Sequence, residues 1–356
     1  MKIPDESFLF GLLEQPSPVG FEMGGQRKWA AFAKKHSKEV ACDAYGSTWA
    51  TLNGKSEKSV MLEAHADEIG YMVKHITDEG YLYVDILGGS DAAAARGKRL
   101  TILGDKGDVS GIIGNTAIHL RARGDEKAPK VHELWVDVGA SSKKDVEKLG
   151  LRVGHVAVYA EGPMYLGKDK LVCRALDNRI GGYIIAQVLK RISKRKTKPS
   201  HDLICLNAVQ EEIGGAGARM ATYRHMPDVS ICIDVTHATD TPGLDAKEVG
   251  QVKLGGGPSV THGSANHPLV VQRLIEVAKE KKITIQHEAT SNSTGTDTDQ
   301  IYGVKQGVPS ALVSLPLRCM HSVVETADIK DIEKTIDLLE AFVLSLSQDD
   351  DFHHTL

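Results

Sequence analysis

Two apolar runs decide the fold: LICLNAVQEEIGG at residues 203–215 and VSICIDV at residues 229–235. Both runs are mostly apolar and carry no charge until they reach an acid, Glu211 with Glu212 in the first and Asp234 in the second. Such runs are typical of buried parallel strands. In open α/β sheets, polar residues beyond the carboxyl ends of parallel strands converge on a ligand site. The two runs therefore predict an α/β domain with an acidic site at one edge of its sheet.

The segments before and after these runs extend the domain. The run SVMLEAH at residues 59–65 predicts another strand, and a helix is expected at roughly residues 23–38. Near the end, Asp328 is placed to cap a helix with one apolar stripe, made of Ile329, Ile332, Ile336, Leu339 and Val343. We therefore expect a mixed sheet flanked by helices, built from residues 1–66 and 166–356 together.

A different pattern occupies residues 67–165. Short alternating or apolar runs, such as YLYVDILGG at residues 81–89, are broken repeatedly by glycine. This spacing is typical of a small β-rich, barrel-like module. One short helix is expected inside it, capped by Ser141 or Ser142 and closed by Gly150. The chain therefore predicts an α/β domain that is interrupted in sequence by an inserted β-rich domain.

The bulk properties exclude several classes of protein. The chain has 356 residues, 41% hydrophobic and 25% charged, with a formal net charge of −4. No basic field argues for nucleic acid or an anionic membrane, and no apolar run approaches the roughly 20 residues that cross a bilayer. The first residues lack a signal-peptide layout, and the five cysteines are scattered without a CxxC pair. We expect a cytoplasmic protein without nucleic-acid or membrane partners.

Polar residues follow apolar runs or loops at five places in the chain. They are His65 with Asp67, Asp177, Glu211 with Glu212, Asp234 and His321. Each residue alone has an ordinary explanation, such as a helix cap, a turn or a core histidine, but five such coincidences together favour a site. The candidate ligands among them are two histidines and three carboxylates, without cysteine: His65, His321, Asp177, Glu212 and Asp234. This donor set suits zinc first, with cobalt or manganese as alternatives.

The spacing assigns roles to some of these residues. His65 and Asp67 project to the same side of an extended chain, which suits a metal-binding imidazole held by a carboxylate. Glu211 and Glu212 point differently, so that one can bind metal while the other acts as general base. Asp177 could bridge two metals or cap the helix that follows it, and its own segment leaves both interpretations open.

If Asp177 bridges, one metal would take His65 and Asp234, and the other would take Glu212 and His321. Two metals roughly 3.5–4 Å apart lower the pKa of a shared water and stabilise a tetrahedral oxyanion. Glu211 would take the proton of this metal-bound water and pass it to the leaving amine.

Six segments carry a resemblance to a known family. In order along the chain they are PSPVGFE, AHADEIGYMV, ALDNRIGG, VQEEIGGAGA, DVTHATDTPG and RCMHSVVE. They resemble the co-catalytic metallopeptidases that include the tetrahedral (TET), deblocking and glutamyl aminopeptidases, and the likeness covers nearly the whole chain.

This resemblance implies a zinc-peptidase-like fold and an aminopeptidase that removes N-terminal residues from peptides. It implies two divalent metal ions per chain, Asp67 as the residue that orients His65, and Glu211 as the base. The residues that align with metal ligands are His65, Asp177, Glu212, Asp234 and His321. It also implies a homo-oligomer, in which the inserted domain forms dimers that can build a tetrahedral dodecamer.

The chain departs from the family pattern at residues 87–100, at the polar loop 291–300, and after His321, where the common proline is missing. These departures bear on assembly and on the substrate pocket. Arg318 and the 291–299 loop could shape a pocket for acidic substrates, although an exposed loop has the same pattern.

Other polar residues are expected to have lesser roles. Four that could reach the pocket are expected to support the site rather than bind metal: His237, His262, His267 and Asp297. Cys319 is expected to be a buried thiol.

Other functions compete with the aminopeptidase. A related metal-dependent carboxypeptidase or deacylase is the stronger rival. An endoglucanase-type glycoside hydrolase needs two carboxyls roughly 5–9.5 Å apart on opposite sides of the bond. The adjacent Glu211 and Glu212 do not supply that geometry by themselves. A non-catalytic assembly protein is disfavoured, because every proposed ligand and the base are present.

Overall fold

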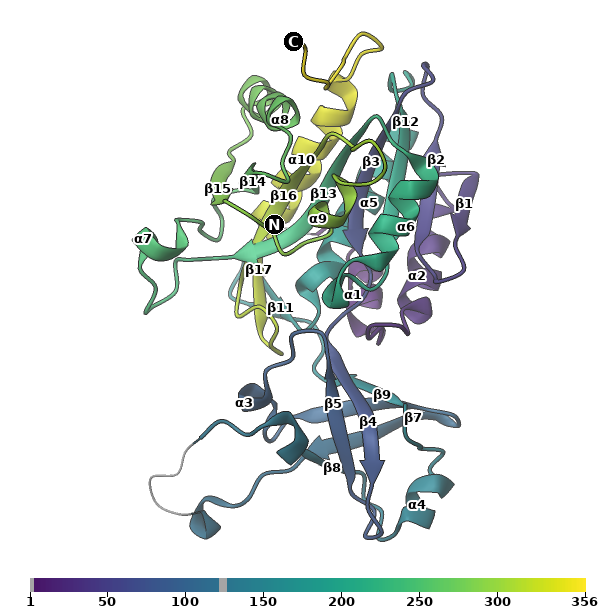
Figure 1. Ribbon diagram of the computed structural model, residues 1–356, viewed down its shortest axis with the longest axis vertical. Coiled ribbons are helices and arrows are strands. Elements are labelled where there is room, and N and C mark those ends of the chain that lie inside the picture. The colour runs from purple at the N-terminus through teal and green to yellow at the C-terminus, as the bar shows by residue number, and fades with distance from the viewer. Residues whose placement is uncertain (1–2, 122–126) are drawn as a thin grey trace.

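The computed structural model describes residues 3–121 and 127–356. A large mixed sheet with its helices forms one half of the molecule, and a small β-barrel projects from one end of that half (Figure 1). The predicted fold class, an α/β domain with an inserted barrel-like domain, is confirmed. Among the described residues, no helix combines the length and the apolarity needed to cross a bilayer.

The main sheet has its parallel strands in the middle. The order along the sheet is β1-β2-β12-β3-β13-β16-β17-β11-β10, and β14 joins β16 to β15 at the side. Strands β12, β3, β13 and β16 are mutually parallel. The pairs toward both ends of this row are antiparallel, whereas β14 and β15 at the side are parallel to each other. The strand bounds are β1 (Glu39–Cys42), β2 (Thr48–Leu52), β3 (Ser59–His65), β10 (Met164–Leu166), β11 (Lys170–Cys173), β12 (Asp202–Ala208), β13 (Val229–His237), β14 (Ser259–Gly263), β15 (Gln286–Thr290), β16 (Ser310–Arg318) and β17 (Glu325–Asp328).

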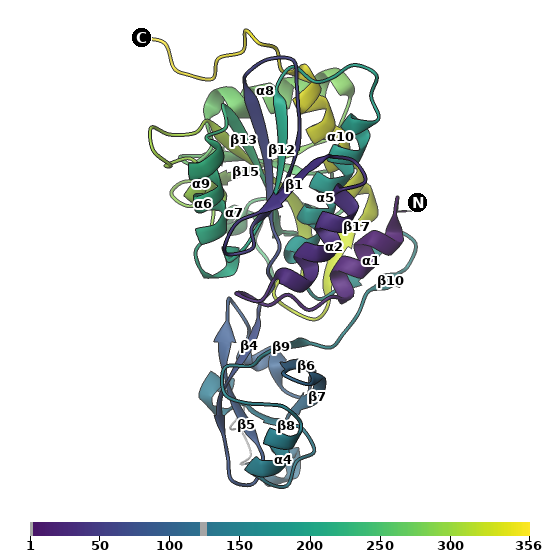
Figure 2. The ribbon, with the colours of Figure 1, turned by 90° about the vertical axis from the view of Figure 1, so that its right-hand side faces the viewer.

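Helices cover both faces of the sheet (Figure 2). The larger core lies under α1 (Glu6–Glu14), α2 (Met23–Ala33), α5 (Leu176–Ser193), α8 (Pro268–Lys281) and α10 (Ile329–Ser345). The smaller core lies under α6 (Ala216–His225) and α9 (Thr298–Ile301), and the short α7 (Ala246–Val249) lies on an exposed loop. Successive side chains of β3 point to opposite faces of the sheet, so that Leu62 packs in the larger core and Met61 in the smaller one.

The inserted segment forms a closed antiparallel barrel with a core of its own. The strand order is β4-β5-β8-β7-β6-β9, with bounds β4 (Gly70–Ile76), β5 (Leu82–Leu87), β6 (Arg99–Gly104), β7 (Gly107–Ile113), β8 (Trp135–Asp137) and β9 (Val156–Tyr159). The helical pieces are α3 (Ala92–Ala95), α4 (Lys143–Lys148), η1 (Ile118–Leu120) and η2 (Val131–Glu133). The Ser142 side chain caps α4 by accepting a hydrogen bond from the Asp145 N–H, so the sequence-predicted short helix is confirmed.

A buried ionic cluster lies where the chain leaves the sheet for the barrel. Glu68, three residues after the end of β3, pairs with Arg174, and its Oε1 lies 2.9 Å from Nη2 of Arg179. The same oxygen accepts a hydrogen bond from the Ser17 N–H at 2.9 Å. Two guanidinium groups and a backbone amide therefore compensate one buried carboxylate, and they tie this junction to α5.

The structure matches the helix predicted near the C-terminus more closely than the helix predicted at residues 23–38. In α10 the whole predicted stripe is buried, and the Asp328 side chain accepts a hydrogen bond from the Lys330 N–H at 2.8 Å. Helix α2 ends at Ala33, earlier than the predicted 38. The Ser37 hydroxyl donates to the Thr51 carbonyl, which turns the chain toward β1 instead of continuing the helix.

The first prediction concerns the larger core. Replacing Leu339, which is fully buried in α10, by alanine should lower the free energy of unfolding by about 2–5 kcal/mol, because it leaves a cavity in a packed interior. Urea unfolding followed by circular dichroism at a fixed protein concentration measures this. Lys330→Ala on the exposed side of the same helix is the control and should leave the midpoint nearly unchanged. Equal midpoints for Leu339→Ala and wild type would contradict the described packing.

Candidate metal centre

The carboxyl ends of the central strands meet at the edge of the sheet that faces the barrel (Figure 1). His65 ends β3, Asp234 lies near the end of β13, and His321 follows β16. Glu211 and Glu212 form the turn η3 (Glu211–Ile213) after β12, and Asp177 lies in the first turn of α5. The structure therefore brings all six of these sequence-predicted residues to one place.

Most of these residues line one cavity of about 820 Å³, with His65 buried beneath it. The His65 Nε2 atom lies 3.2 Å from Asp177 Oδ1 and 3.6 Å from Asp234 Oδ1. The His321 Nε2 atom lies 3.3 Å from Asp177 Oδ2 and 3.5 Å from Glu212 Oε2. The two oxygens of Asp177 thus face two different histidines.

The geometry defines two candidate donor trios that share Asp177. One contains His65 and Asp234, the other Glu212 and His321, and within each trio the donor atoms lie within 4.8 Å of one another. Asp177 makes no side-chain hydrogen bond to the backbone of α5 among the described residues, which argues against the helix-cap interpretation. Imidazole and carboxylate donors in this arrangement fit divalent transition metals.

Glu325 accepts backbone hydrogen bonds from two of the candidate ligands, His321 and Asp177. Its Oε1 accepts a hydrogen bond from the His321 N–H at 2.8 Å, and its Oε2 accepts one from the Asp177 N–H at 3.1 Å. The carboxylate is buried, at 2% exposure, so these two bonds fix the backbone of both residues. Sequence analysis missed this role, although Glu325 closes the RCMHSVVE segment four residues after His321.

Asp67 connects β3 to the turn that carries the glutamates. Its Oδ1 lies 3.4 Å from His65 Nδ1, but the geometry is not that of a hydrogen bond. Its two oxygens instead accept hydrogen bonds from the N–H groups of Glu211 and Glu212, each at 3.1 Å. Asp67 therefore lies on the predicted side of His65 and also fixes the position of η3.

A loop of the barrel contacts the second trio. The Gly89 carbonyl oxygen lies 3.2 Å from His321 Nδ1, and a Cβ atom on Gly89 would lie only 2.5 Å from that nitrogen. A Cβ atom on Gly88 would lie 3.0 Å from the Glu212 side chain. Two consecutive glycines after β5 thus allow the barrel backbone to approach both residues closely.

The electrostatics of the site favour a bound cation. Burial, reinforced by neighbouring acids, raises the pKa of Glu211 to about 10 and that of Glu212 to about 8. Burial also raises the pKa of Asp234. Burial alone would raise the pKa of Asp177, but hydrogen bonds from His321 and His65 outweigh it and lower that pKa. Acids held this close cannot all ionise without added positive charge, which divalent cations would supply.

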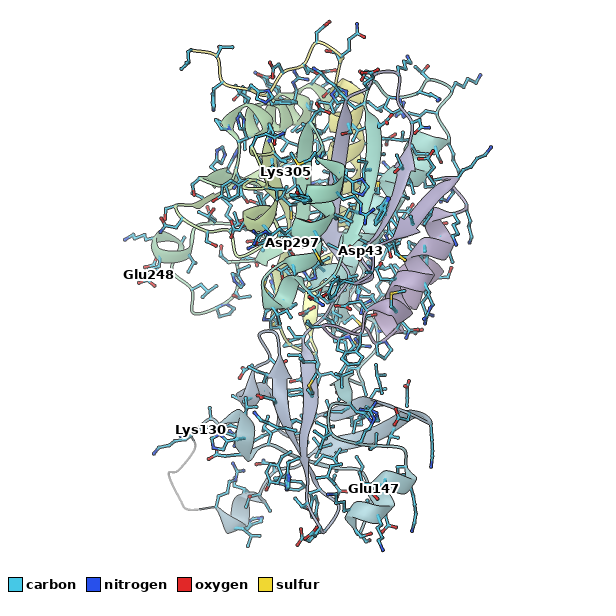
Figure 3. The ribbon with its side chains drawn as sticks, turned by 45° about the vertical axis from the view of Figure 1, so that its right-hand side comes forward. Asp43, Lys130, Glu147, Glu248, Asp297 and Lys305 are labelled. Carbon is cyan, nitrogen blue, oxygen red and sulfur yellow. The ribbon has the colours of Figure 1, made fainter. Side chains whose placement is uncertain are left out.

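A pair of buried acids lies under the site. Glu63 is two residues before His65 on β3, and Asp297 precedes α9, in the sheet half (Figure 3). Both side chains are almost fully buried, and burial raises the pKa of Glu63 to about 7. Asp297 is 1% exposed, its charge interacts with that of Glu63, and it does not line the cavity among the described residues. Sequence analysis did not single out Glu63, because one acid within an apolar run gives little local signal.

The three histidines expected to support the site differ in where they lie. His237 lines the cavity. His262 and His267 do not line it and instead contact other histidines: His262 Nε2 lies 2.9 Å from His287 Nδ1, and the His267 ring stacks on that of His354. The expectation of a buried thiol at Cys319 is wrong: the residue is exposed, because the chain turns in a left-handed conformation (φ 56°) just after β16.

Arg318 does not provide the cation expected for an acidic-substrate pocket. Its guanidinium makes two hydrogen bonds to Asp240, at 2.9 and 2.6 Å, and it does not line the cavity among the described residues. The loop 291–299 does contribute to the cavity wall, through Thr294, Gly295, Thr296 and Asp299.

Comparisons with known proteins find similar chains that cover nearly all of this one. The family model of M42 glutamyl aminopeptidases matches residues 46–338. The lysyl aminopeptidase of Pyrococcus furiosus is 34% identical over 338 residues, covering 94% of this chain and 95% of that protein. A TET aminopeptidase structure from a marine sediment thaumarchaeon has a TM-score of 0.92 at 27% identity, covering 97% of both chains. The Pyrococcus horikoshii TET1 peptidase, which can assemble into a tetrahedron or a large octahedral shell, has a TM-score of 0.86 at 26% identity, covering 96% of this chain and 99% of that one.

The second prediction concerns metal uptake and pH. The hydrogen bond to Asp177 raises the pKa of His321 to about 9, so its imidazole is protonated at neutral pH in the metal-free protein. A metal must displace that proton, so the apparent affinity for Zn²⁺ should rise as pH increases and level off above about 9. Titration calorimetry in buffers of different ionisation enthalpy measures the released proton. His132→Gln, at an exposed barrel histidine, is the control, and an affinity that is flat between pH 6.5 and 9 would contradict the assignment.

The third prediction concerns the contact between barrel and site. Gly89→Ala should displace the His321 ring and weaken metal binding by about 10–100-fold at the trio that contains it. Elemental analysis after dialysis measures the metal retained per chain. Gly162→Ala is the matched control, because a Cβ atom there meets nothing within 4 Å. Equal metal content in the two variants would show that the Gly89 contact does not position His321.

Proposed function

The chain belongs to the M42 glutamyl aminopeptidase family, whose members hydrolyse N-terminal residues from peptides, and we propose that this chain does so through two divalent cations. One cation would be held by His65, Asp177 and Asp234, and the other by Asp177, Glu212 and His321. Zinc fits this donor set first, with cobalt or manganese as alternatives. The observation that carries the proposal is the placement of Asp177, whose two oxygens face the two histidines.

The cations, when bound, would supply Lewis acidity toward the scissile carbonyl and toward a water molecule. Glu211 would accept a proton from this water and pass it to the departing amine. Support for the role comes from its position: it lines the cavity, and its Oε2 lies 3.9 Å from His65 Nε2. Burial raises its pKa to about 10 in the metal-free site, where the carboxyl would hold a proton at neutral pH. Bound cations would lower this pKa and leave a carboxylate that can accept a proton.

Glu211 has one competing role. It lies close enough to His65 and Glu212 to form a third possible donor group. A carboxylate committed to a metal is a poor proton acceptor, so the two roles predict different results when its charge is removed.

The cavity favours an exopeptidase that recognises the amino end. A free α-amino group can be held by carboxylates such as those that line this cavity. A carboxypeptidase needs a cation for the terminal carboxylate of its substrate, and no lysine or arginine lines this cavity among residues 3–121 and 127–356. The geometry therefore favours an aminopeptidase over the carboxypeptidase alternative.

We also propose a homo-oligomer in which the inserted domain, residues 67–165, forms the dimer contact. The barrel exposes several large apolar side chains, namely Ile86, Ile112, Ile118, Leu120 and Val153. Apolar residues gathered on one small module are typical of association surfaces. A tetrahedral dodecamer, like the tetrahedron of the TET1 relative, would enclose the sites and admit peptides.

The fourth prediction tests the general base. Glu211→Gln should lower kcat for a leucine p-nitroanilide by about 10²–10⁴-fold, because the amide cannot accept the proton. Metal content per chain, measured on the same sample by elemental analysis, should stay at the wild-type value. Loss of metal in Glu211→Gln would assign Glu211 to the ligands. Hydrolysis only of N-acylated or C-terminal substrates by the wild type would support a deacylase or carboxypeptidase instead.

A further inference from the structure

We propose that Glu288 makes this enzyme selective for peptides whose N-terminal residue carries a basic side chain, lysine or arginine. The inference rests on the proposed function, because it concerns the same cavity. Three observations carry it: Glu288 has one oxygen without a hydrogen-bond donor, Thr236 holds its other oxygen, and no lysine or arginine of the described residues lines the cavity around it.

Glu288 reaches the cavity from β15, which lies outside the main row of strands. Its Oε1 accepts a hydrogen bond from the Thr236 hydroxyl at 2.6 Å. Its Oε2 is buried and has no hydrogen-bond partner among the described residues. One oxygen is thus fixed in place while the other lacks a donor, and a buried acceptor without a donor is unfavourable until a donor arrives.

Thr236 relates the position of Glu288 to that of the candidate ligand Asp234. Thr236 lies two residues beyond Asp234 on β13, so the two side chains project to the same side of the strand, roughly 6.6 Å apart along it. The four-carbon stem of lysine, or the arm of arginine, suits a span of this order. A substrate whose α-carbon lies beside the metal trios could therefore place its terminal cation near Glu288.

The charges around the cavity leave Glu288 without compensation. Four wall carboxylates, Asp177, Glu211, Glu212 and Asp234, lie where the proposed cations would balance them. Asp299 also lines the cavity, but its oxygens accept hydrogen bonds from the N–H groups of Thr294 and Gly295 and so hold the loop. Glu288 therefore supplies a negative charge that a substrate can pair with.

Nearby cations of the protein do not take this role. Arg318 is occupied by Asp240, and no lysine or arginine in the described part of the chain lines the cavity. His237 is the remaining basic side chain on the wall apart from His321, and it is exposed. A lysine or arginine side chain would gain a partly buried ion pair with Glu288, whereas a glutamate side chain would be repelled.

The experiment compares aminoacyl-p-nitroanilides of lysine, arginine, norleucine, leucine and glutamate as substrates. Norleucine matches the lysine stem without its charge, so the ratio of kcat/KM for lysine to that for norleucine isolates the ammonium group. We expect a ratio of about ten or more in the metal-loaded wild type, and a fall to near one in Glu288→Gln. Glu147→Gln, at an exposed residue on the far side of the barrel (Figure 3), is the matched control and should keep the wild-type ratio.

The outcomes distinguish this inference from the proposed function. Hydrolysis of leucine and norleucine substrates with no preference for lysine or arginine would overturn the role of Glu288 and leave the aminopeptidase intact. Hydrolysis of none of the five substrates would overturn the proposed function itself. If Glu288→Gln also loses activity on leucine, the wild-type ratio still decides, and Glu288→Asp should keep part of the lysine preference because it retains the charge.

Discussion

Repulsion among carboxylates gathered at the ends of parallel strands is the constraint on which the rest of this structure depends. Asp177, Glu211, Glu212 and Asp234 lie around two imidazoles and are buried or half-buried. A fold that places so many acids together must either keep them protonated or supply positive charge. Asp67 and Glu325, which hold backbone positions close to these acids, are themselves carboxylic acids and add no positive charge. In the second solution the positive charge would therefore come from bound cations.

The parallel strands could be predicted from the sequence because their signal is local. Runs such as those ending at Asp234 and Glu211 are apolar, short and closed by an acid, and β13 and β12 follow them closely. The convergence of these acids follows from parallel topology alone. The barrel was also predictable, because short runs separated by glycine repeat throughout residues 67–165.

Contacts between distant segments could not be predicted in this way. The ALDN segment alone allowed both a helix cap and a bridge for Asp177, and only the positions of His65 and His321 distinguish them. Glu325 supports Asp177 across 148 residues of sequence. Glu288 lies on a short strand with alternating exposure, and it becomes noticeable only when Thr236 and the cavity are placed beside it. Distances of this kind depend on tertiary packing, which no local pattern encodes.

The Gly88–Gly89 loop changes how the two halves of the molecule should be viewed. By topology the barrel is a separate closed unit, but its backbone carbonyl lies against the ring of His321. A shortened chain without the barrel would keep every candidate ligand and lose the group that faces one of them. The insertion therefore contributes a backbone group to the candidate metal centre. If the barrel also forms the proposed dimer contact, a substitution in this one segment would affect both association and metal binding.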